Sequence, residues 1–248
     1  MDKKIDFSNI ELPQTIYKYR DWEDEFHKRI ITNREVYLSS PERFTDKKDC
    51  KIPIRYDLLT YGELEKKVKF DNPDWIRQRR RKFVRDWYKN RKDYVMEQQE
   101  YFQKQFFERF GVLSLTANPH NELMWLDYAN IAQGFCIGFN TEILFQHLGG
   151  GGDVKYYDEL PIIFPEPKQS FEEQHHLQIF SKLREFEYEQ EYRTHIFSRN
   201  PLSENERKII IPPEAYKEII FGKNITSLVE EQILQNIPEE LGHIILVN

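Results

Sequence analysis

The feature of this sequence that most constrains its fold is a long stretch, from Asp74 to Phe110, that contains neither glycine nor proline. Apolar residues recur through it at roughly helical spacing, and Asp71-Asn72-Pro73 immediately before it is a helix-start signal. A single helix of this length would measure about 55 Å at 1.5 Å per residue, which is too long for a compact domain. The stretch therefore predicts a broken helix or a protruding helical pair, inserted into the chain at about residues 57–110.

Short segments with strand and helix patterns surround this insertion without a regular βαβ order. Strands are predicted at residues 15–20, 35–39, 112–116, 134–139, 154–157, 192–197, 208–211, 219–221 and 243–247. Helices are predicted at residues 22–32, 123–129, 141–148 and 171–186. This order favours a single α+β domain over residues 1–248, built on a mixed, partly split β-sheet with flanking helices and the inserted helical segment.

The composition argues against a membrane protein and against a secreted domain that is stabilised by disulfide bonds. Hydrophobic residues make up 39% of the chain, and no apolar run approaches the roughly 20 residues that cross a bilayer. Residues 1–7 lack the apolar core of a secretory signal, so we expect a soluble cytoplasmic protein. Cys50 and Cys136 lie far apart in the sequence, which predicts buried free thiols rather than a disulfide or a metal knuckle.

Positive charge is concentrated in one part of an otherwise acidic chain. The formal net charge is -6, yet nine lysines and arginines lie between Arg77 and Lys92, with aromatic residues interleaved. Such a run can present charge to phosphates and rings to bases. The alternative is a solvent-exposed helix face, which is favoured because Phe83 and Trp87 share an inward stripe. The candidate contacts for nucleic acid or another acidic partner are Arg79, Arg80, Arg81 and Arg85.

Glu187, Glu189 and Glu191 alternate with mostly aromatic residues. If this segment is extended, the three carboxylates point to one side at a spacing of about 6.5 to 7 Å. Carboxylates at that range raise one another's proton affinity, and one that faces a cleft can accept a hydrogen bond from a sugar hydroxyl or stabilise an oxocarbenium-like centre. The alternative is a solvent-facing strand edge in which Arg193 is an internal counter-ion.

Three sets of motifs, spread over most of the chain, resemble the signatures of a widespread bacterial domain family of unknown function. The first set comprises Tyr17-Lys18-Tyr19-Arg20, Val36-Tyr37-Leu38-Ser39-Ser40-Pro41 and a turn that keeps Phe44, Asp46, Asp49 and Cys50 but lacks the family's first Asn and its Pro-Phe pair. The second comprises Ser114-Leu115, Met124-Trp125-Leu126-Asp127-Tyr128-Ala129 and Gly134-Phe135-Cys136-Ile137-Gly138-Phe139, with Ala132 where relatives usually carry histidine. The third comprises Lys182, Phe186, Tyr188-Glu189-Gln190-Glu191-Tyr192-Arg193 and Ile219-Ile220-Phe221-Gly222.

The order of these parts is also similar to ADP-ribosyltransferase-type domains, especially DNA-modifying toxins and RNA 2′-phosphotransferases. This resemblance implies an ADP-ribosyltransferase-like fold that uses NAD as a substrate and binds no cofactor permanently. Glu191 would hold the ribose 2′-hydroxyl and stabilise charge at the anomeric carbon, and Glu189 would orient or deprotonate the acceptor. The implied NAD-binding residues are Arg20, Tyr19, Tyr37, Ser39 and Ser40. We therefore expect an NAD-using intracellular toxin or anti-phage defence effector with a protein or nucleic-acid acceptor and no metal.

Two other functions remain open from the sequence. The first is a nucleic-acid-binding protein or metal-dependent nuclease, which docks through the basic run and holds a divalent metal with Asp46, Asp49 and Glu191. The second is a non-catalytic ligand sensor or interaction module. In that case the helical region from Asp74 to Phe110 binds a partner, and the polar cleft holds a ligand.

Overall fold

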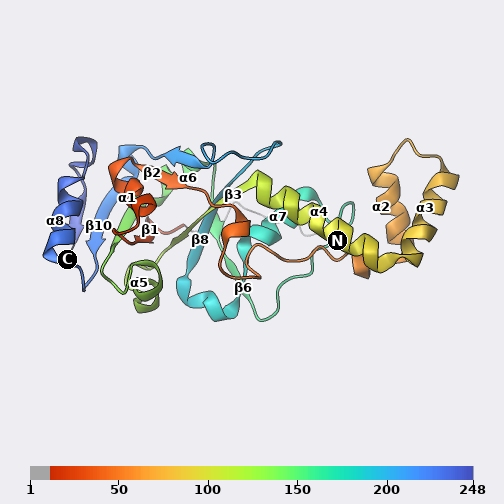
Figure 1. Ribbon diagram of the computed structural model, residues 1–248, viewed down its shortest axis with the longest axis horizontal. Helices are drawn as coiled ribbons and strands as arrows, with labels where there is room; N and C mark the ends of the chain where they lie inside the picture. Colours follow the sequence, from red (N-terminus) through yellow and green to blue (C-terminus); the bar gives the residue numbers. More distant parts are fainter. Residues whose placement is uncertain (1–11, 248) are drawn as a thin grey trace.

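The computed structural model describes residues 12–247 and has a mixed α+β architecture, as predicted (Figure 1). The strands of the central sheet in this part of the chain are β1 (Thr15–Arg20), β3 (Phe110–Thr116), β4 (Phe135–Asn140), β5 (Gly152–Asp153), β8 (Glu191–Phe197), β10 (Tyr216–Phe221) and β11 (Ile245–Val247). They lie in the order β11-β10-β4-β1-β3-β8-β5. Neighbouring strands are antiparallel except β10 and β11, so the sheet is mixed.

The sheet is split between β1 and β3. Strand β1 pairs with β4 from Thr15 to Arg20, whereas it pairs with β3 at a single position, where Tyr17 lies opposite Thr116. At its other positions β1 pairs with β4 but not with β3. An opening therefore lies near the centre of the sheet, and it is the feature that positions the candidate site.

Helices cover both faces of the sheet. In the described part, the α-helices are α1 (Glu25–Thr32), α2 (Tyr61–Asp71), α3 (Arg77–Lys89), α4 (Arg91–Arg109), α5 (Glu122–Tyr128), α6 (Thr141–Leu148), α7 (Phe171–Phe180) and α8 (Ser227–Gln235). On one face, α1, α6 and α8 share a large apolar core with the strands. On the other face, α5 packs beside β1 and β4, and α4 and α7 pack beside the start of β3. The candidate site lies between these two smaller cores.

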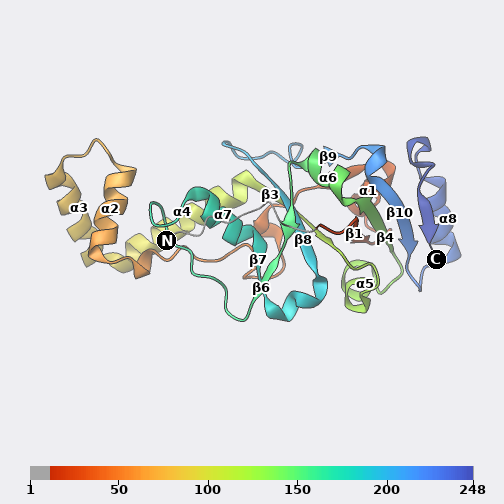
Figure 2. The same ribbon diagram turned by 180° about the vertical axis from the view of Figure 1, so that it is seen from behind.

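Helices α2 and α3 and the first part of α4 form an arm that projects from the sheet (Figures 1 and 2). The expected break in the long helical stretch lies at Asn90, between the end of α3 at Lys89 and the start of α4 at Arg91. Val84 and Trp87 of α3 pack with apolar residues of α2 in a separate hydrophobic cluster, which also includes Ile163 from a later part of the chain. Since α4 continues directly into β3, this end of the arm joins the sheet without a loop.

Shorter elements of the described part include β2 (Glu35–Tyr37) paired with β9 (Lys208–Ile210), β6 (Lys155–Tyr157) paired with β7 (Ser181–Leu183), and the 3-10 helices Pro41–Arg43, Tyr56–Leu58, Arg184–Glu189, Pro213–Ala215 and Glu239–Leu241. The prediction of one helix over residues 171–186 is wrong. Helix α7 ends at Phe180, and the chain then forms β7 because it meets β6 in parallel register.

Within residues 12–247, no helix combines the length and the hydropathy that a membrane span requires. Cys50 and Cys136 are buried free thiols, as predicted. Residues 1–7, on which the expectation of a cytoplasmic protein depends, lie outside the described residues.

Candidate functional site

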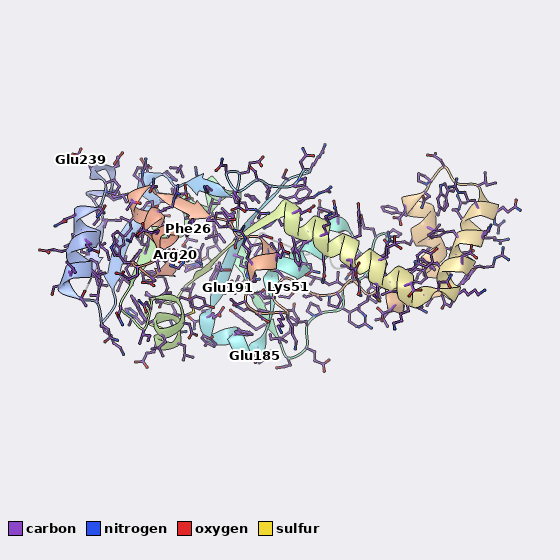
Figure 3. All side chains as sticks on the ribbon, viewed as in Figure 1. Arg20, Phe26, Lys51, Glu185, Glu191 and Glu239 are labelled. Carbon is purple, nitrogen blue, oxygen red and sulfur yellow. The ribbon has the colours of Figure 1, made fainter. Side chains whose placement is uncertain are left out.

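A cavity of about 410 Å³ lies where β1 and β3 separate. Its walls include residues 17–20 of β1, residues 114–116 of β3 and the loop that follows Ser39, together with α5 and the segment that leads into β8. Figure 3 shows Glu191 near the middle of the molecule and Arg20 on its side away from the arm. The cavity brings together residues from all three motif sets of the sequence.

Strand β1 contributes side chains from both of its faces to the cavity. Lys18 and Arg20 leave one face of the strand. Tyr17 and Tyr19 leave the other, since side chains alternate along a strand. Both pairs line the cavity because β3 does not cover this part of β1. The amino group of Lys18 spans the opening and donates a hydrogen bond to the carbonyl oxygen of Ser114 on β3, at 2.5 Å.

A tight turn places Glu189 and Glu191 beside one another. Residues Arg184–Glu189 form a 3-10 helix, and Gln190 then adopts a left-handed conformation with φ of 44° before β8 begins. The hydroxyl of Thr116 donates to the carbonyl oxygen of Glu189 at 2.6 Å, which ties this turn to β3. The turn ends at Glu191, whose backbone N–H donates to a tyrosine hydroxyl on β6 at 2.8 Å.

The expectation that Glu187, Glu189 and Glu191 line one side of an extended strand is wrong, because the first two lie in the 3-10 helix. Glu187 is exposed and forms an ion pair with Arg184 at 3.2 Å. Glu189 and Glu191 are each only 4% exposed, so the alternative of a solvent-facing edge is also wrong for them. Arg193 is the counter-ion of Glu191, as that alternative expected.

Arg193 is completely buried and holds Glu191 and Asp49 in place. Its Nε and Nη2 donate to the Glu191 carboxylate at 2.7 and 2.9 Å, and its Nη1 and Nη2 donate to the Asp49 carboxylate at 2.8 and 2.7 Å. Nη1 also donates to the carbonyl oxygen of Ile179 at 2.7 Å. Every N–H of the guanidinium therefore has an acceptor, which is the condition under which a charge can be buried.

Lys182 bridges the two glutamates. Its buried amino group donates to Oε2 of Glu189 and, at 3.1 Å, to Oε2 of Glu191. It also lies 3.7 Å from Oδ2 of Asp49. The hydroxyl of Tyr128, on α5, donates to the other oxygen of Glu189 at 3.0 Å. Since one amino group contacts both glutamates, their carboxylates lie next to each other in the cavity wall.

The pKa values of the two glutamates shift in opposite directions. Burial raises the pKa of Glu189, and Lys182 offsets this only in part. Burial acts in the same sense on Glu191, but the charges of Arg193 and Lys182 outweigh it and lower the pKa of Glu191 to about 2. One carboxylate therefore stays ionised and the other binds a proton more readily than usual. This pattern is typical of sites in which one carboxylate stabilises positive charge and the other transfers a proton.

Lys18 and Arg20 are basic residues of the cavity, and neither forms an ion pair within 4.0 Å with a described residue. Part of the Lys18 side chain is exposed, but protein atoms surround its amino group, and burial together with the Arg20 charge lowers the pKa of Lys18 to about 7. Burial lowers the pKa of Arg20 to about 10, so its guanidinium remains charged at neutral pH. The two side chains can bind an anionic group such as a phosphate.

The other residues proposed for NAD binding are placed differently. Tyr37 does not line the cavity, and its hydroxyl donates to Glu204 at 2.8 Å. Ser40 is buried, and its hydroxyl donates to a backbone carbonyl near the end of α4 at 2.9 Å. Tyr19 lines the cavity, but it is 2% exposed and its ring packs edge-on against Trp125. Of these three residues, Tyr37 and Ser40 therefore lie outside the cavity, and Tyr19 contributes to its wall as a packed side chain.

Arg20 and Ser39 do line the cavity with the two glutamates. Sequence reasoning missed Lys18, Lys182 and Tyr128. A signal existed for Lys18, because strand alternation places it on the same face as Arg20. Lys182 was part of the third motif set, but its contact with both glutamates depends on β7, which the sequence did not predict.

The candidate metal ligands have other partners. Asp49 and Glu191 both direct their two carboxylate oxygens at Arg193, and Asp46 accepts a hydrogen bond from the backbone of Lys48 at 2.9 Å. Within residues 12–247, no group of three or more His, Cys, Asp or Glu side chains is arranged to hold a metal ion. The remaining candidate contacts lie on α3 in the arm, outside the cavity: Arg79, Arg80, Arg81 and Arg85.

Comparison with known families finds that the model of DUF2971, described as a protein of unknown function, matches residues 124–194. The match runs from α5 through Lys182, Glu189, Glu191 and Arg193, and so includes most of the charged cluster. It confirms the predicted resemblance to a domain family of unknown function. No curated protein and no solved structure matches the chain.

Proposed function

We propose that this protein cleaves the N-glycosidic bond of NAD and transfers the ADP-ribosyl group, in the manner of an ADP-ribosyltransferase. The observation that carries the proposal is the pair Glu189 and Glu191, bridged by Lys182 and opposed in pKa, in one cavity with unpaired cations. Glycosidic bond cleavage suits such a pair, because positive charge grows at the anomeric carbon while a proton has to be moved.

The charge of the cavity favours a substrate that carries phosphate groups. Lys18 and Arg20 lie on the β1 wall without carboxylate partners among the described residues, and they would bind the pyrophosphate. The cavity volume of about 410 Å³ is within the range of small-molecule sites. The two glutamates line the same cavity, so the ribose of the substrate would lie beside both the cations and the carboxylates.

In the proposed reaction, the bond between ribose C1′ and the nicotinamide nitrogen breaks, its electron pair leaves with nicotinamide, and C1′ becomes positively charged. The ionised carboxylate of Glu191 offsets this charge, and Arg193 keeps that carboxylate in a fixed orientation. An acceptor oxygen then bonds to C1′ and gives its proton to Glu189. The raised pKa of Glu189 makes its ionised form a stronger base than an ordinary glutamate.

Phe186 takes the place of the tyrosines as the surface for the nicotinamide ring. It lines the cavity and is half-buried, so part of its ring is open to a ligand. The amino group of Lys182 lies 4.9 Å from the centre of this ring, which places Phe186 beside both glutamates. Aromatic rings stack in offset or edge-on arrangements on such a surface.

Release of nicotinamide from NAD, measured with and without cell extract as a source of acceptors, tests the proposal. Glu191→Gln keeps the size of the side chain but removes its charge, so the rate should fall by about 100-fold or more, as for the loss of one oxyanion-stabilising group. Glu187→Gln is the matched control, because this residue lies in the same segment but does not line the cavity, and it should keep the wild-type rate.

Thermal unfolding of each variant separates a loss of chemistry from a loss of fold. The proposal is overturned if the wild type releases no nicotinamide even with extract present, or if folded Glu191→Gln matches the wild-type rate. Label transferred from the adenosine part of NAD to a macromolecule distinguishes transfer from simple hydrolysis of NAD.

We further propose that this activity operates in the cytoplasm, where the protein acts as a toxin or an anti-phage defence effector. An enzyme that consumes NAD or modifies a cellular acceptor would stop growth when it is active. Induced expression of the wild type should therefore arrest bacterial growth and lower cellular NAD or label an acceptor, whereas Glu191→Gln should permit growth. Equal growth of both strains at equal protein levels would contradict the toxin assignment.

A further inference from the structure

Helix α3 presents a basic face at the end of the arm, far from α8 at the other end of the molecule (Figure 1). Val84 and Trp87 are buried in the hydrophobic cluster of the arm, and Phe83 packs beside them. At about 100° per residue, Arg81, Lys82, Arg85 and Lys89 fall on the side opposite to these three residues, and Arg77 and Arg79 fall on its two flanks. These six residues are the exposed cations of the helix.

This basic face is strongly charged for a chain whose formal net charge is -6. Nine lysines and arginines lie between Arg77 and Lys92, and Asp86 is the single acidic residue in that interval. None of the exposed cations of α3 forms an ion pair with a described residue. Some exposed cations elsewhere in the structure do: Arg43 pairs with a glutamate at 2.7 Å, and Arg184 with an aspartate at 2.7 Å.

Four of these cations follow one another at intervals of four residues and form a single row along the helix: Arg77, Arg81, Arg85 and Lys89. Like charges at this spacing repel one another and destabilise a helix. The arm tolerates this repulsion although the rest of the chain has an excess of acidic residues that could have neutralised it. A bound polyanion would remove the repulsion.

We propose that the basic face of α3 binds the sugar-phosphate backbone of a single-stranded nucleic acid. Neighbouring members of the row are about 5–6 Å apart, a regular repeat that suits a polymer with one charge on every unit. Four of the six exposed cations of α3 are arginines, whose guanidinium groups form paired hydrogen bonds with phosphate oxygens.

Aromatic rings beside the basic face favour a single strand over a duplex. The ring of Tyr88 is partly exposed, lies 5.5 Å from the ring of Tyr61, and lies 5.0 Å from the guanidinium carbon of Arg91. The guanidinium carbon of Arg79 lies 4.1 Å from the ring of Trp75. Rings and guanidinium planes of this kind can stack on bases, and bases are free to stack on protein only where they are unpaired.

This inference does not rest on the proposed reaction. Helix α3 packs in a hydrophobic cluster separate from those around the cavity, and none of its exposed cations lines the cavity. A variant of the basic face therefore changes nucleic-acid binding, and Glu191→Gln changes NAD chemistry. Failure of one proposal leaves the other standing.

Fluorescence anisotropy with a labelled single-stranded oligonucleotide tests the inference, with the matching duplex and poly-glutamate as comparison probes. Arg81→Glu with Arg85→Glu reverses two neighbouring charges of the row, and glutamate is a good helix former, so α3 should persist. The affinity of this variant for the single strand should fall by about tenfold or more. Its salt dependence should also weaken, because each lost phosphate contact lowers the slope of log K against log salt by about 0.7.

Arg199→Glu with Lys223→Glu is the matched control, because it makes the same change of charge at exposed positions outside the arm. Its affinity should differ from that of the wild type by less than about twofold. Arg81→Gln with Arg85→Gln, which introduces no repulsion, should weaken binding in the same direction by a smaller factor. Circular dichroism checks that each variant is folded.

Several results would overturn the inference. Binding of poly-glutamate, competed by the oligonucleotide only weakly, would assign the basic face to an acidic protein. Tighter binding of the duplex would remove the single-stranded specificity. Salt-independent binding by the wild type, or an equal loss of affinity in the control outside the arm, would show that α3 is not the contact surface.

Discussion

Arg193 and Glu191, two positions apart on β8, are joined by hydrogen bonds of 2.7 and 2.9 Å. Residues at this spacing share one face of a strand, so β8 positions the carboxylate and its counter-ion side by side. Arg193 has no exposed surface, which means that water cannot compete for its hydrogen bonds. The orientation of Glu191 is therefore set by the fold before any ligand arrives.

Removal of the Arg193 charge should strongly destabilise the protein. Arg193→Met leaves Asp49 and Glu191 buried without their main counter-ion, and breaking a buried ion pair in this way costs about 3–5 kcal/mol. Urea denaturation gives the change in the free energy of unfolding. Arg184→Met is the control, because its ion pairs are exposed and their loss should change stability little. Equal effects of the two substitutions would contradict the role given to Arg193.

The stability of the fold should depend on pH through Glu191. Its pKa is about 2 in the folded protein and about 4.3 in an unfolded chain, so the unfolded state binds more protons between these values. The stability that it contributes is complete above the unfolded pKa and is lost as pH falls toward 2. Glu189, whose folded pKa is raised, contributes in the opposite sense, since its stabilising effect is lost as pH rises.

Denaturation curves at a series of acidic pH values test this prediction. Glu191→Gln should flatten the fall in unfolding free energy toward pH 2, whereas Glu189→Gln should leave that fall in place. A profile that Glu191→Gln does not change would show that this carboxylate is not the one that Arg193 and Lys182 hold ionised.

Lys18 should react with acylating reagents at lower pH than other lysines. With a pKa of about 7, half of its amino groups are unprotonated at neutral pH, whereas an ordinary lysine with a pKa of about 10.4 is almost fully protonated. Peptide mass spectrometry after brief labelling should show a half-maximal rate near pH 7 for this residue. ADP-ribose should protect it if the cavity binds phosphate beside Arg20. A labelling profile equal to that of exposed lysines would contradict the shifted pKa.

Substitutions of Arg20 and Glu189 should affect different kinetic constants of the proposed NAD reaction. Arg20→Met removes a phosphate contact that the bound substrate and the transition state share, so KM should rise by about tenfold with kcat little changed. Glu189→Gln removes the proton acceptor and should lower kcat more than it changes KM. Initial rates over a range of NAD concentrations separate the two effects. The same pattern for both variants would contradict the separate roles.

Gly134 should be intolerant of a side chain because it fits against the end of β1. A Cβ at this position would lie 2.1 Å from the carbonyl oxygen of Arg20 and 3.1 Å from Cα of Asp21. Gly134→Ala should therefore displace the end of β1 and lower the free energy of unfolding by about 1–3 kcal/mol. Gly62→Ala is the control, since an added Cβ there meets nothing within 4 Å and alanine favours the helix. It should stabilise α2 by about 0.5–1 kcal/mol.

Elements with strong local signals could be predicted from the sequence with accurate bounds. The strand at Thr15–Arg20 and the helix at Thr141–Leu148 agree with the structure at both ends. For the helix, the reason is visible in its caps: the side chain of Asn140 accepts a hydrogen bond at its start, and Gly149 takes the left-handed conformation after its end. Both caps depend on residues next to the ends of the helix, so the sequence pattern there is sufficient to predict its bounds.

The predicted helix over residues 171–186 fails for the opposite reason. Ser181–Leu183 forms a strand because it pairs with Lys155–Tyr157, a partner that local periodicity does not reveal. The alignment of the three glutamates depended on an extended segment, whereas the structure has a 3-10 helix and a left-handed residue, Gln190, at this place.

The sequence was sufficient to predict several residues of the site, but not the contacts between them. Alternation and motif resemblance pointed to Arg20 and to the glutamates at positions 189 and 191, and the cavity contains all three. The nuclease alternative makes Asp49 a metal ligand, whereas in the structure its carboxylate accepts hydrogen bonds from Arg193, which lies on a distant part of the chain. Contacts between residues so far apart depend on the complete fold, and no spacing in the sequence encodes them.

Helix α4 ends at Arg109 and β3 begins at Phe110, so a rod and a strand share one continuous backbone. The cavity wall that contains Ser114 is therefore the direct continuation of the helix that carries the arm. The hydrogen bond from Lys18 to β3 lies on this continuous segment, so the arm and the cavity share a backbone.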